Sequence, residues 1–134
     1  MEKGRITQVI GPVIDVEFTT GKLPMIRDAL TVEVNGKKRV MEVAQHMGNR
    51  TVRCIMLATS EGLSKNMEVT ATGSCIKVPV GEKTLGRMFN VLGEPIDKKG
   101  DVNVEEKWEI HRKAPSFQEQ SPVVEVLETG IKSI

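Results

Sequence analysis

Thr31 to Met47 reads TVEVNGKKRVMEVAQHM, and this stretch carries the clearest fold signal in the chain. Apolar residues alternate with polar ones on both sides of Asn35-Gly36. The alternating apolar residues are Val32 and Val34 before the turn, and Val40 and Val43 after it. Asn-Gly supplies the two positive-φ residues that a type I′ turn needs, and such turns join antiparallel strands. The stretch therefore predicts a β-hairpin.

Strand-like segments lie on both sides of this hairpin. Upstream, residues 5–18 (RITQVIGPVIDVEF) form two β-rich runs that meet at Gly11-Pro12, with period-2 alternation at Ile14, Val16 and Phe18. Downstream, residues 49–60 place alternate residues on one predicted face, namely Val52, Cys54, Met56 and Ala58. Residues 67–80 repeat the pattern, whereas residues 22–30 (KLPMIRDAL) are expected to form a loop over one end.

Several short strands separated by Gly, Pro and Asn-Gly predict a small sandwich or barrel. A barrel is favoured because closure removes the edge strands that a small sheet would expose. After Pro79 the chain becomes rich in Gly, Pro and charge, with little sustained periodicity. We expect a mainly β protein with a barrel domain at 1–80 and an incomplete, extended connector at 81–134.

Composition points to a globular protein with little affinity for nucleic acid. The 134 residues are 39% apolar and 28% charged, with a net charge of +1. Residues 1–80 hold 11 Lys/Arg and 8 Asp/Glu, a balance of +3, and Phe18 is their one aromatic residue. Proteins that bind single strands combine a basic groove with stacking aromatics, so no nucleic-acid partner is expected.

No set of residues assembles a catalytic, cofactor or metal site. Gly81–Met88 (GEKTLGRM) has the G-x-x-x-x-G frame of a phosphate loop but lacks the Lys-Ser/Thr that contacts phosphate and magnesium. His46 and His111 have no nucleophile beside them in sequence, and Glu105-Glu106 lacks partners at metal-ligand spacing. Trp108 lies in a charged stretch and is expected to be half-buried. We therefore predict no catalytic, no cofactor-binding and no metal-binding residue in this sequence.

The two cysteines and the N-terminal residues indicate in which cellular environment the protein is expected. Cys54 and Cys75 form no Cys-x-x-Cys pair and lie among apolar residues, so buried reduced thiols are predicted rather than zinc ligands. The first residues have no apolar signal core, and no run approaches membrane-spanning length. A cytoplasmic or membrane-peripheral protein is expected.

Five blocks of sequence, in order, resemble the N-terminal part of the beta subunit of F-type ATP synthase. They are GRITQVIGPVIDVEF, LPMIRDAL, EVAQHMGNRTVRCIMLATSEGL, VPVGEKTLGRMFNVLGEPID and HRKAPSFQEQSPVVEVLETGIK. The last two blocks separate beta from its alpha paralogue, which is similar around LGEPID and ETGIK but lacks HRKAPSFQEQS. The resemblance covers essentially the whole chain.

The resemblance implies a six-stranded barrel that packs beside alpha-subunit barrels in a crown, followed by the start of an α/β P-loop domain. It places the phosphate loop, the catalytic glutamate and the Walker B aspartate beyond Ile134, so the chain is expected to stop before the catalytic machinery. The full-length parent would bind ATP or ADP with Mg²⁺. It would carry out rotary ATP synthesis coupled to ion translocation. Any membrane association would be indirect, through that complex.

Two further possibilities follow from the residues. The first is a free-standing small-barrel binding module of the oligonucleotide/oligosaccharide type, which the scarcity of aromatics and of positive charge disfavours. The second concerns the apolar tail at Val123, Val124, Val126 and Leu127. We expect this tail either to pack back on the barrel or to pair with another copy through an open strand edge.

Overall fold

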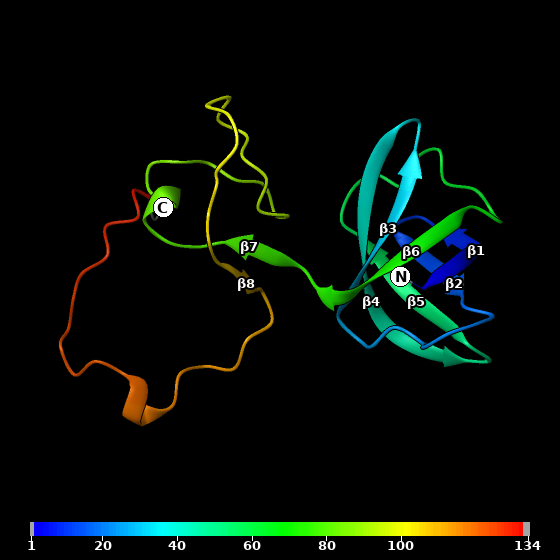
Figure 1. Cartoon of the computed structure of the whole chain (residues 1–134), viewed down its shortest axis with the longest axis horizontal. Helices are drawn as coiled ribbons and strands as arrows, with labels where there is room; N and C mark the ends of the chain where they lie inside the picture. The colour runs from blue at the N-terminus through cyan, green and yellow to red at the C-terminus, as the bar shows by residue number, and fades with distance from the viewer. Residues whose placement is uncertain (1, 133–134) are drawn as a thin grey trace.

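The structure, a computed structural model, describes residues 2–132, and its dominant feature is a closed barrel of six antiparallel strands (Figure 1). The strands neighbour one another in the order β1-β2-β5-β4-β3-β6, and β6 pairs with β1 to close the sheet. Their bounds are β1 Lys3–Ile10, β2 Val13–Glu17, β3 Asp28–Val34, β4 Lys37–Gly48, β5 Thr51–Met56 and β6 Glu68–Cys75. The predicted mainly β fold with a six-stranded barrel is confirmed.

The predicted hairpin joins β3 to β4. Asn35 and Gly36 have φ of 52° and 72°, the positive values that a type I′ turn requires at both central positions. Val34 pairs with Lys37 directly across the turn. A second turn with positive φ at both central positions, Asn49 at 47° and Arg50 at 59°, joins β4 to β5. We did not predict that turn from the sequence, because arginine is not a residue that favours positive φ.

Alternate residues of the six strands fill the barrel. The predicted inward residues Ile14, Val16 and Phe18 are fully buried. The core also takes Ile6, Leu30, Val32, Val34, Met41, Val43, Val52, Cys54, Met56, Val69 and Ala71. Gly4 makes room for this packing, since a Cβ there would lie 2.9 Å from both the Phe18 ring and the Glu17 carbonyl oxygen.

Two local expectations need correction. Ala58 is exposed rather than part of the inward row, because β5 ends at Met56 and the chain leaves the sheet. The expected loop at 22–30 is shorter than predicted, since Asp28 already begins β3. The remaining loop does lie against the barrel, where Leu23 packs on the core.

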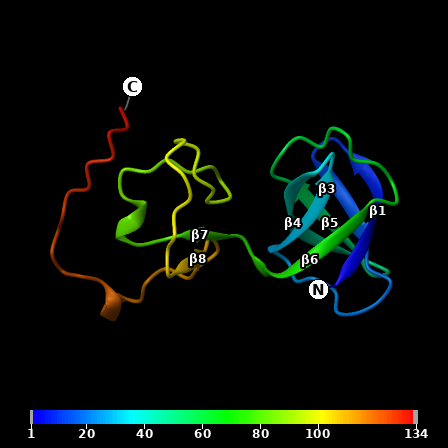
Figure 2. The same ribbon diagram turned by 45° about the horizontal axis from the view of Figure 1, so that its top comes forward.

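Beyond the barrel the chain forms a small, loosely built connector (Figure 2). Strand β7 (Lys77–Pro79) pairs antiparallel with β8 (Lys107–Glu109), and a short 3₁₀ turn, η1, covers Glu82–Thr84. The barrel sheet therefore ends at Cys75. The proposed domain boundary at residue 80 stays a prediction. Among residues 2–132, no helix is long and apolar enough to cross a membrane.

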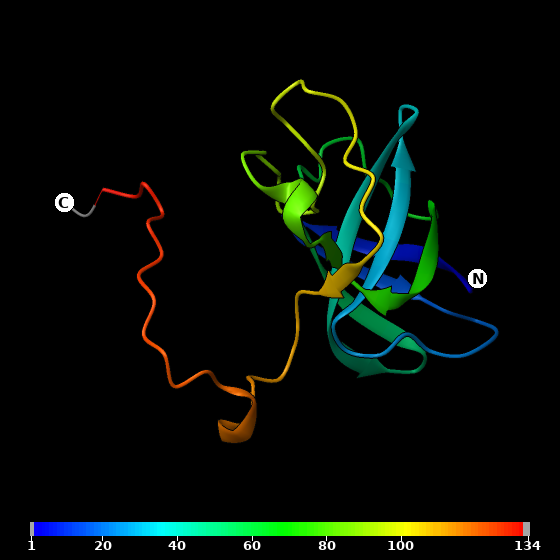
Figure 3. The ribbon, with the colours of Figure 1, turned by 60° about the vertical axis from the view of Figure 1, so that its left-hand side comes forward.

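The tail runs away from the barrel as extended chain (Figure 3). Up to residue 132, its one regular element is the 3₁₀ turn η2 (Phe117–Glu119), closed by a capping box between Ser116 and Glu119. Val124 is 93% exposed and Leu127 84% exposed, so the tail does not pack back on the barrel. The last two residues of the predicted connector, 133 and 134, lie outside the described residues.

Candidate functional site: the outer face of the barrel

The outer face of β1, β2, β5 and β4 carries two neighbouring rows of side chains. Residues directly opposite one another in a sheet project from the same face. One row runs Ile10, Val13, Ile55 and Glu42 across the four strands, and Ile10 and Ile55 are 54% and 47% exposed. We call Ile10, Val13 and Ile55 the apolar row.

The second row is polar and runs parallel to the first, through Gln8, Asp15, Arg53 and Gln45. Arg53 donates two hydrogen bonds to Asp15, from Nε to Oδ1 and from Nη2 to Oδ2, each 2.8 Å long. These bonds, reinforced by the charge of Arg53 and opposed by burial, hold the pKa of the Asp15 carboxyl below its usual value. The pair links the side chains of β2 and β5 beside the apolar row.

The sequence did not reveal the Asp15–Arg53 pair. Asp15 is 7% exposed, although it lies on the outward side of β2. Its partner is 38 positions away in the chain. Only the register of β2 against β5 shows that the two side chains meet.

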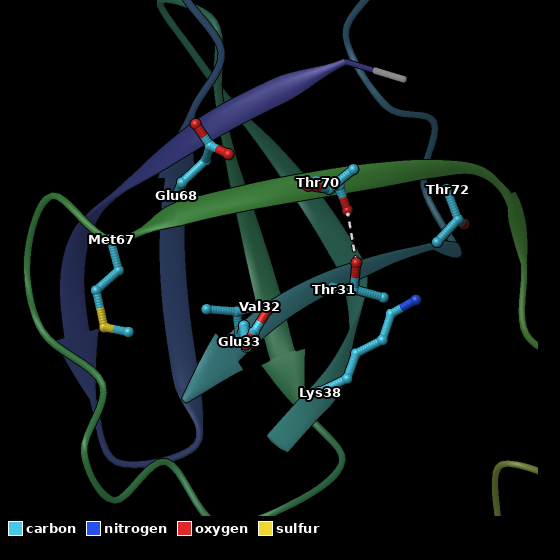
Figure 4. Close-up of a pocket in the computed structure, with 8 residues that line it drawn as sticks. All are labelled: Thr31, Val32, Glu33, Lys38, Met67, Glu68, Thr70 and Thr72. Atoms are coloured by element: carbon cyan, nitrogen blue, oxygen red, sulfur yellow. Dashed lines mark hydrogen bonds between the residues drawn. The ribbon is translucent and has the colours of Figure 1, made fainter. Parts of the chain in front are cut away.

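A groove of about 490 Å³ lies between β6 and the end of the β3–β4 hairpin (Figure 4). The Thr31 hydroxyl donates to the Thr70 carbonyl oxygen across it, at 3.4 Å. Its carboxylates already have basic neighbours, since Glu33 lies opposite Lys38 and Glu68 lies 2.7 Å from Lys3. The residues that line the groove include no histidine or cysteine.

The phosphate-loop frame at Gly81–Met88 serves a structural purpose. Arg87 donates to Asp97 from Nε at 2.5 Å and from Nη2 at 3.0 Å, and Nη2 also reaches the Gly100 carbonyl oxygen. The hydrogen bonds from Arg87 hold the pKa of Asp97 well below its usual range. The guanidinium is therefore already engaged in closing the loop at 87–100.

The two histidines contact different parts of the chain. His46 Nε2 is 2.7 Å from the Pro24 carbonyl oxygen, at the loop between β2 and β3. His111 Nε2 is 2.8 Å from Glu42 Oε2, so it links the connector to the barrel.

Neither Trp108 nor the acidic pair beside it joins a reactive cluster. Trp108 is 44% exposed, close to the expected half-burial, with the Arg112 guanidinium 3.6 Å from its ring centre. Its indole N–H donates to Glu106 at 2.6 Å. Within residues 2–132, no group of three or more His, Cys, Asp or Glu side chains is arranged to hold a metal ion.

The cysteines differ from each other in burial. Cys54 lies in the core, and burial raises the pKa of its thiol to about 12, which keeps it protonated. Cys75, at the end of β6, is only half-buried, so the prediction of two buried thiols is correct for Cys54 alone. A strand end lacks neighbours on one side, and that position explains the exposure of Cys75.

The fold and the outer face together define a class of protein. It is a small closed barrel whose interior is filled by side chains. The model of the ATP synthase alpha/beta family, beta-barrel domain, matches residues 6–73, half of the chain. The chain belongs to this family.

Proposed function

We propose that this chain is the barrel and connector portion of a beta-type subunit of F-type ATP synthase, and that it serves assembly. Its partners would be alpha subunits, whose barrels would lie beside it in a crown. The family match supports the class, and the block HRKAPSFQEQS supports beta rather than alpha. The observation that carries the assembly role is the apolar row on the outside of a barrel whose core is already filled.

The apolar row has the character of an interface core. Ile10, Val13 and Ile55 are adjacent across three strands, so they form one contiguous strip rather than scattered exposed residues. Protein interfaces bury such a strip at their centre and surround it with polar groups. Here Asp15 and Arg53 flank the strip on one side, and Glu42 continues its line onto β4.

In this proposal the full-length parent, and not this chain alone, binds the nucleotide and carries out catalysis. The parent would use ATP or ADP with Mg²⁺ in rotary synthesis or hydrolysis coupled to ion translocation. The chain itself would be cytoplasmic, and membrane-peripheral when assembled. We expect no MgATP binding by calorimetry at micromolar nucleotide, and tight binding would contradict the non-catalytic role.

A direct test is complex formation with an ATP synthase alpha subunit, measured by size-exclusion chromatography with light scattering. Ile55→Glu places a charge in the apolar row and should abolish co-elution. Ile26→Glu is the matched control, because Ile26 is 54% exposed but lies in the loop before β3. Equal co-elution of both variants with the alpha subunit would refute the apolar row as the interface.

The oligonucleotide-binding alternative has no supporting observation in the structure. Phe18, the one aromatic residue among residues 2–80, is fully buried and cannot stack on a base. Self-pairing of the exposed tail at Val123–Leu127 stays a secondary proposal. A concentration-dependent rise in mass by light scattering would support it.

A further inference from the structure

A cavity of about 450 Å³ lies where the barrel and the connector meet. On the barrel side it is lined by residues of β3, β4 and β6. On the connector side it is lined by residues of β7, of β8 and of the loop between η1 and β8. Sites for small molecules typically occupy roughly 300–1,000 Å³, so a small ligand would fit in this cavity.

Contacts within the chain hold the connector side of this cavity in place. His111 Nε2 lies 2.8 Å from Glu42 Oε2, which joins the end of β8 to β4 of the barrel. The loop that supplies Leu92 packs closely on β7, since a Cβ at Gly93 would lie 2.6 Å from Pro79 Cδ. The walls of the cavity are therefore formed without a ligand, as is usual for small-molecule sites.

Three lysines from three different strands line the cavity. They are Lys38 of β4, Lys77 of β7 and Lys107 of β8. Lys77 already has an acidic neighbour, since its Nζ lies 3.8 Å from Glu109 Oε1. Within residues 2–132, neither Lys38 nor Lys107 forms an ion pair. Lysine is positively charged at neutral pH, so two ammonium groups at this cavity have no carboxylate partner.

The acidic side chains nearest to these lysines have other contacts or directions. Glu33 lies opposite Lys38 in the sheet, but Figure 4 shows the Lys38 amino group pointing away from Glu33, toward the side where Thr72 lies. Glu94 is the one carboxylate among the described residues of the lining, and it accepts a hydrogen bond from the Asn90 side-chain amide at 2.8 Å. The lining therefore has an excess of positive charge.

Much of the remaining lining is apolar. Val40 of β4, Ile76 at the crossing from β6 to β7, and Leu92 contribute aliphatic surface. The Thr72 hydroxyl donates to the Ala29 carbonyl oxygen at 2.7 Å, so its hydrogen is already used within the protein. Positive charge beside aliphatic surface suits a ligand that is anionic at one end and apolar at the other.

We propose that this cavity binds a small amphipathic anion, with its charged group beside Lys38 and Lys107 and its apolar chain against Val40 and Leu92. An ammonium group on a flexible stem can follow a single carboxylate or phosphate group, and hydrogen bonds between such charged groups are strong. The apolar chain gains free energy because it leaves water. This site is separate from the apolar row, and its occupancy does not require the alpha subunit.

The test is a methyl NMR titration of the full chain at neutral pH with octanoate, and in a second arm with octyl phosphate. The largest shifts should fall on the methyl groups of Val40, Ile76 and Leu92. Binding of either anion there supports the proposal, and the tighter of the two identifies the preferred headgroup. Octanol has a chain of the same length without the charge, so it should bind at least about threefold more weakly.

Variants of the two unpaired lysines test the role of charge. Lys38→Gln and Lys107→Gln should each weaken octanoate binding about threefold, because an ion pair that water reaches contributes little, and the double variant about tenfold. Lys37→Gln is the matched control, since Lys37 precedes Lys38 on β4, is exposed and does not line the cavity. This variant should bind octanoate as the wild type does.

Three results would overturn the proposal. The first is that neither anion shifts the cavity methyl groups, or that both shift them no more than those of the exposed residues Val124 and Leu127. The second is equal octanoate affinity in the wild type and in the double lysine variant. The third is that octanol binds as tightly as octanoate, which would show that the lysines do not select an anion.

Discussion

Four arginine side chains link strands and loops of this chain through hydrogen bonds. Arg39 donates to the carbonyl oxygens of Thr59 and Glu61 at 2.7 and 2.6 Å. Arg50 donates to those of Phe18 and Gly21 at 2.5 and 2.6 Å. The remaining two make the carboxylate pairs Arg53–Asp15 and Arg87–Asp97. The fork of the guanidinium suits such multiple contacts, which lysine could not reproduce.

The Asp15–Arg53 pair gives the sharpest prediction for a single residue. Asp15→Ala should lower the free energy of unfolding by about 1 kcal/mol, because Arg53, whose side chain is 35% exposed, loses both acceptors of its bidentate contact. Urea unfolding followed by circular dichroism measures the change. Glu17→Ala, an exposed carboxylate on the same strand, should change stability by less than about 0.5 kcal/mol. Equal losses in the two variants would contradict the assignment.

The same pair predicts how stability depends on pH. The pKa of Asp15 is lower in the folded chain than its ordinary value of 3.8, chiefly because Arg53 donates to it. A lowered folded-state pKa stabilises the fold above the unfolded value, and this contribution is lost as the pH falls through the folded value. The difference in unfolding free energy between wild type and Asp15→Ala should therefore shrink as the pH falls below 3.8. A difference that stays constant to low pH would exclude this origin.

At the scale of elements, the turns decide the strand registers. Gly36 has φ of 72° and open space where a Cβ would stand, so a side chain there costs backbone strain rather than a clash. Gly4 shows the opposite case, in which a Cβ would meet the Phe18 ring. Gly36 is therefore needed for its backbone conformation, and Gly4 for the space that a side chain would fill.

Gly36→Ala should therefore destabilise the chain by about 1 kcal/mol, the cost of a left-handed conformation for a residue with a Cβ. Gly36→Asn should cost clearly less, because asparagine tolerates positive φ. Thermal unfolding of both variants measures the difference. Equal midpoints for wild type and Gly36→Ala would show that the turn does not need a positive φ.

The loop at 87–100 should depend on the Arg87–Asp97 pair for its closure. Arg87→Gln removes the charged fork, so the amide of Ile96, bonded to the Met88 carbonyl oxygen at 2.9 Å, should exchange faster with deuterium. Lys99→Gln, in the same loop, is the matched control and should leave that exchange unchanged. Unchanged exchange in Arg87→Gln would show that the loop closes without the pair.

The barrel could be predicted from the sequence because its signals are local. Asn35-Gly36 specifies its turn by itself, and Ile14, Val16 and Phe18 show their shared face by alternation. Asp15–Arg53, Arg87–Asp97 and His111–Glu42 could not be predicted, since each depends on register or on packing between distant segments. Arg50 at positive φ was missed for a similar reason, because acceptors from another loop compensate its strain.

At the scale of the whole molecule, the chain consists of a rigid barrel, a loosely attached connector and an extended tail. Fourteen residues make up the buried core cluster, and all of them lie between Ile6 and Ala71. Within residues 77–132, no residue of the connector or tail is buried. Stability should therefore reside in the barrel, and the connector should be able to move without unfolding it.

The central claim is that the barrel presents its apolar row to an alpha-subunit barrel. Titrating isotope-labelled chain with unlabelled alpha-subunit barrel, and following the amide and methyl resonances, tests it most directly. The account predicts that the largest shifts fall on Ile10, Val13, Ile55 and their neighbours on β1, β2 and β5. Shifts confined to the groove between β3 and β6, or no shifts at all, would contradict it.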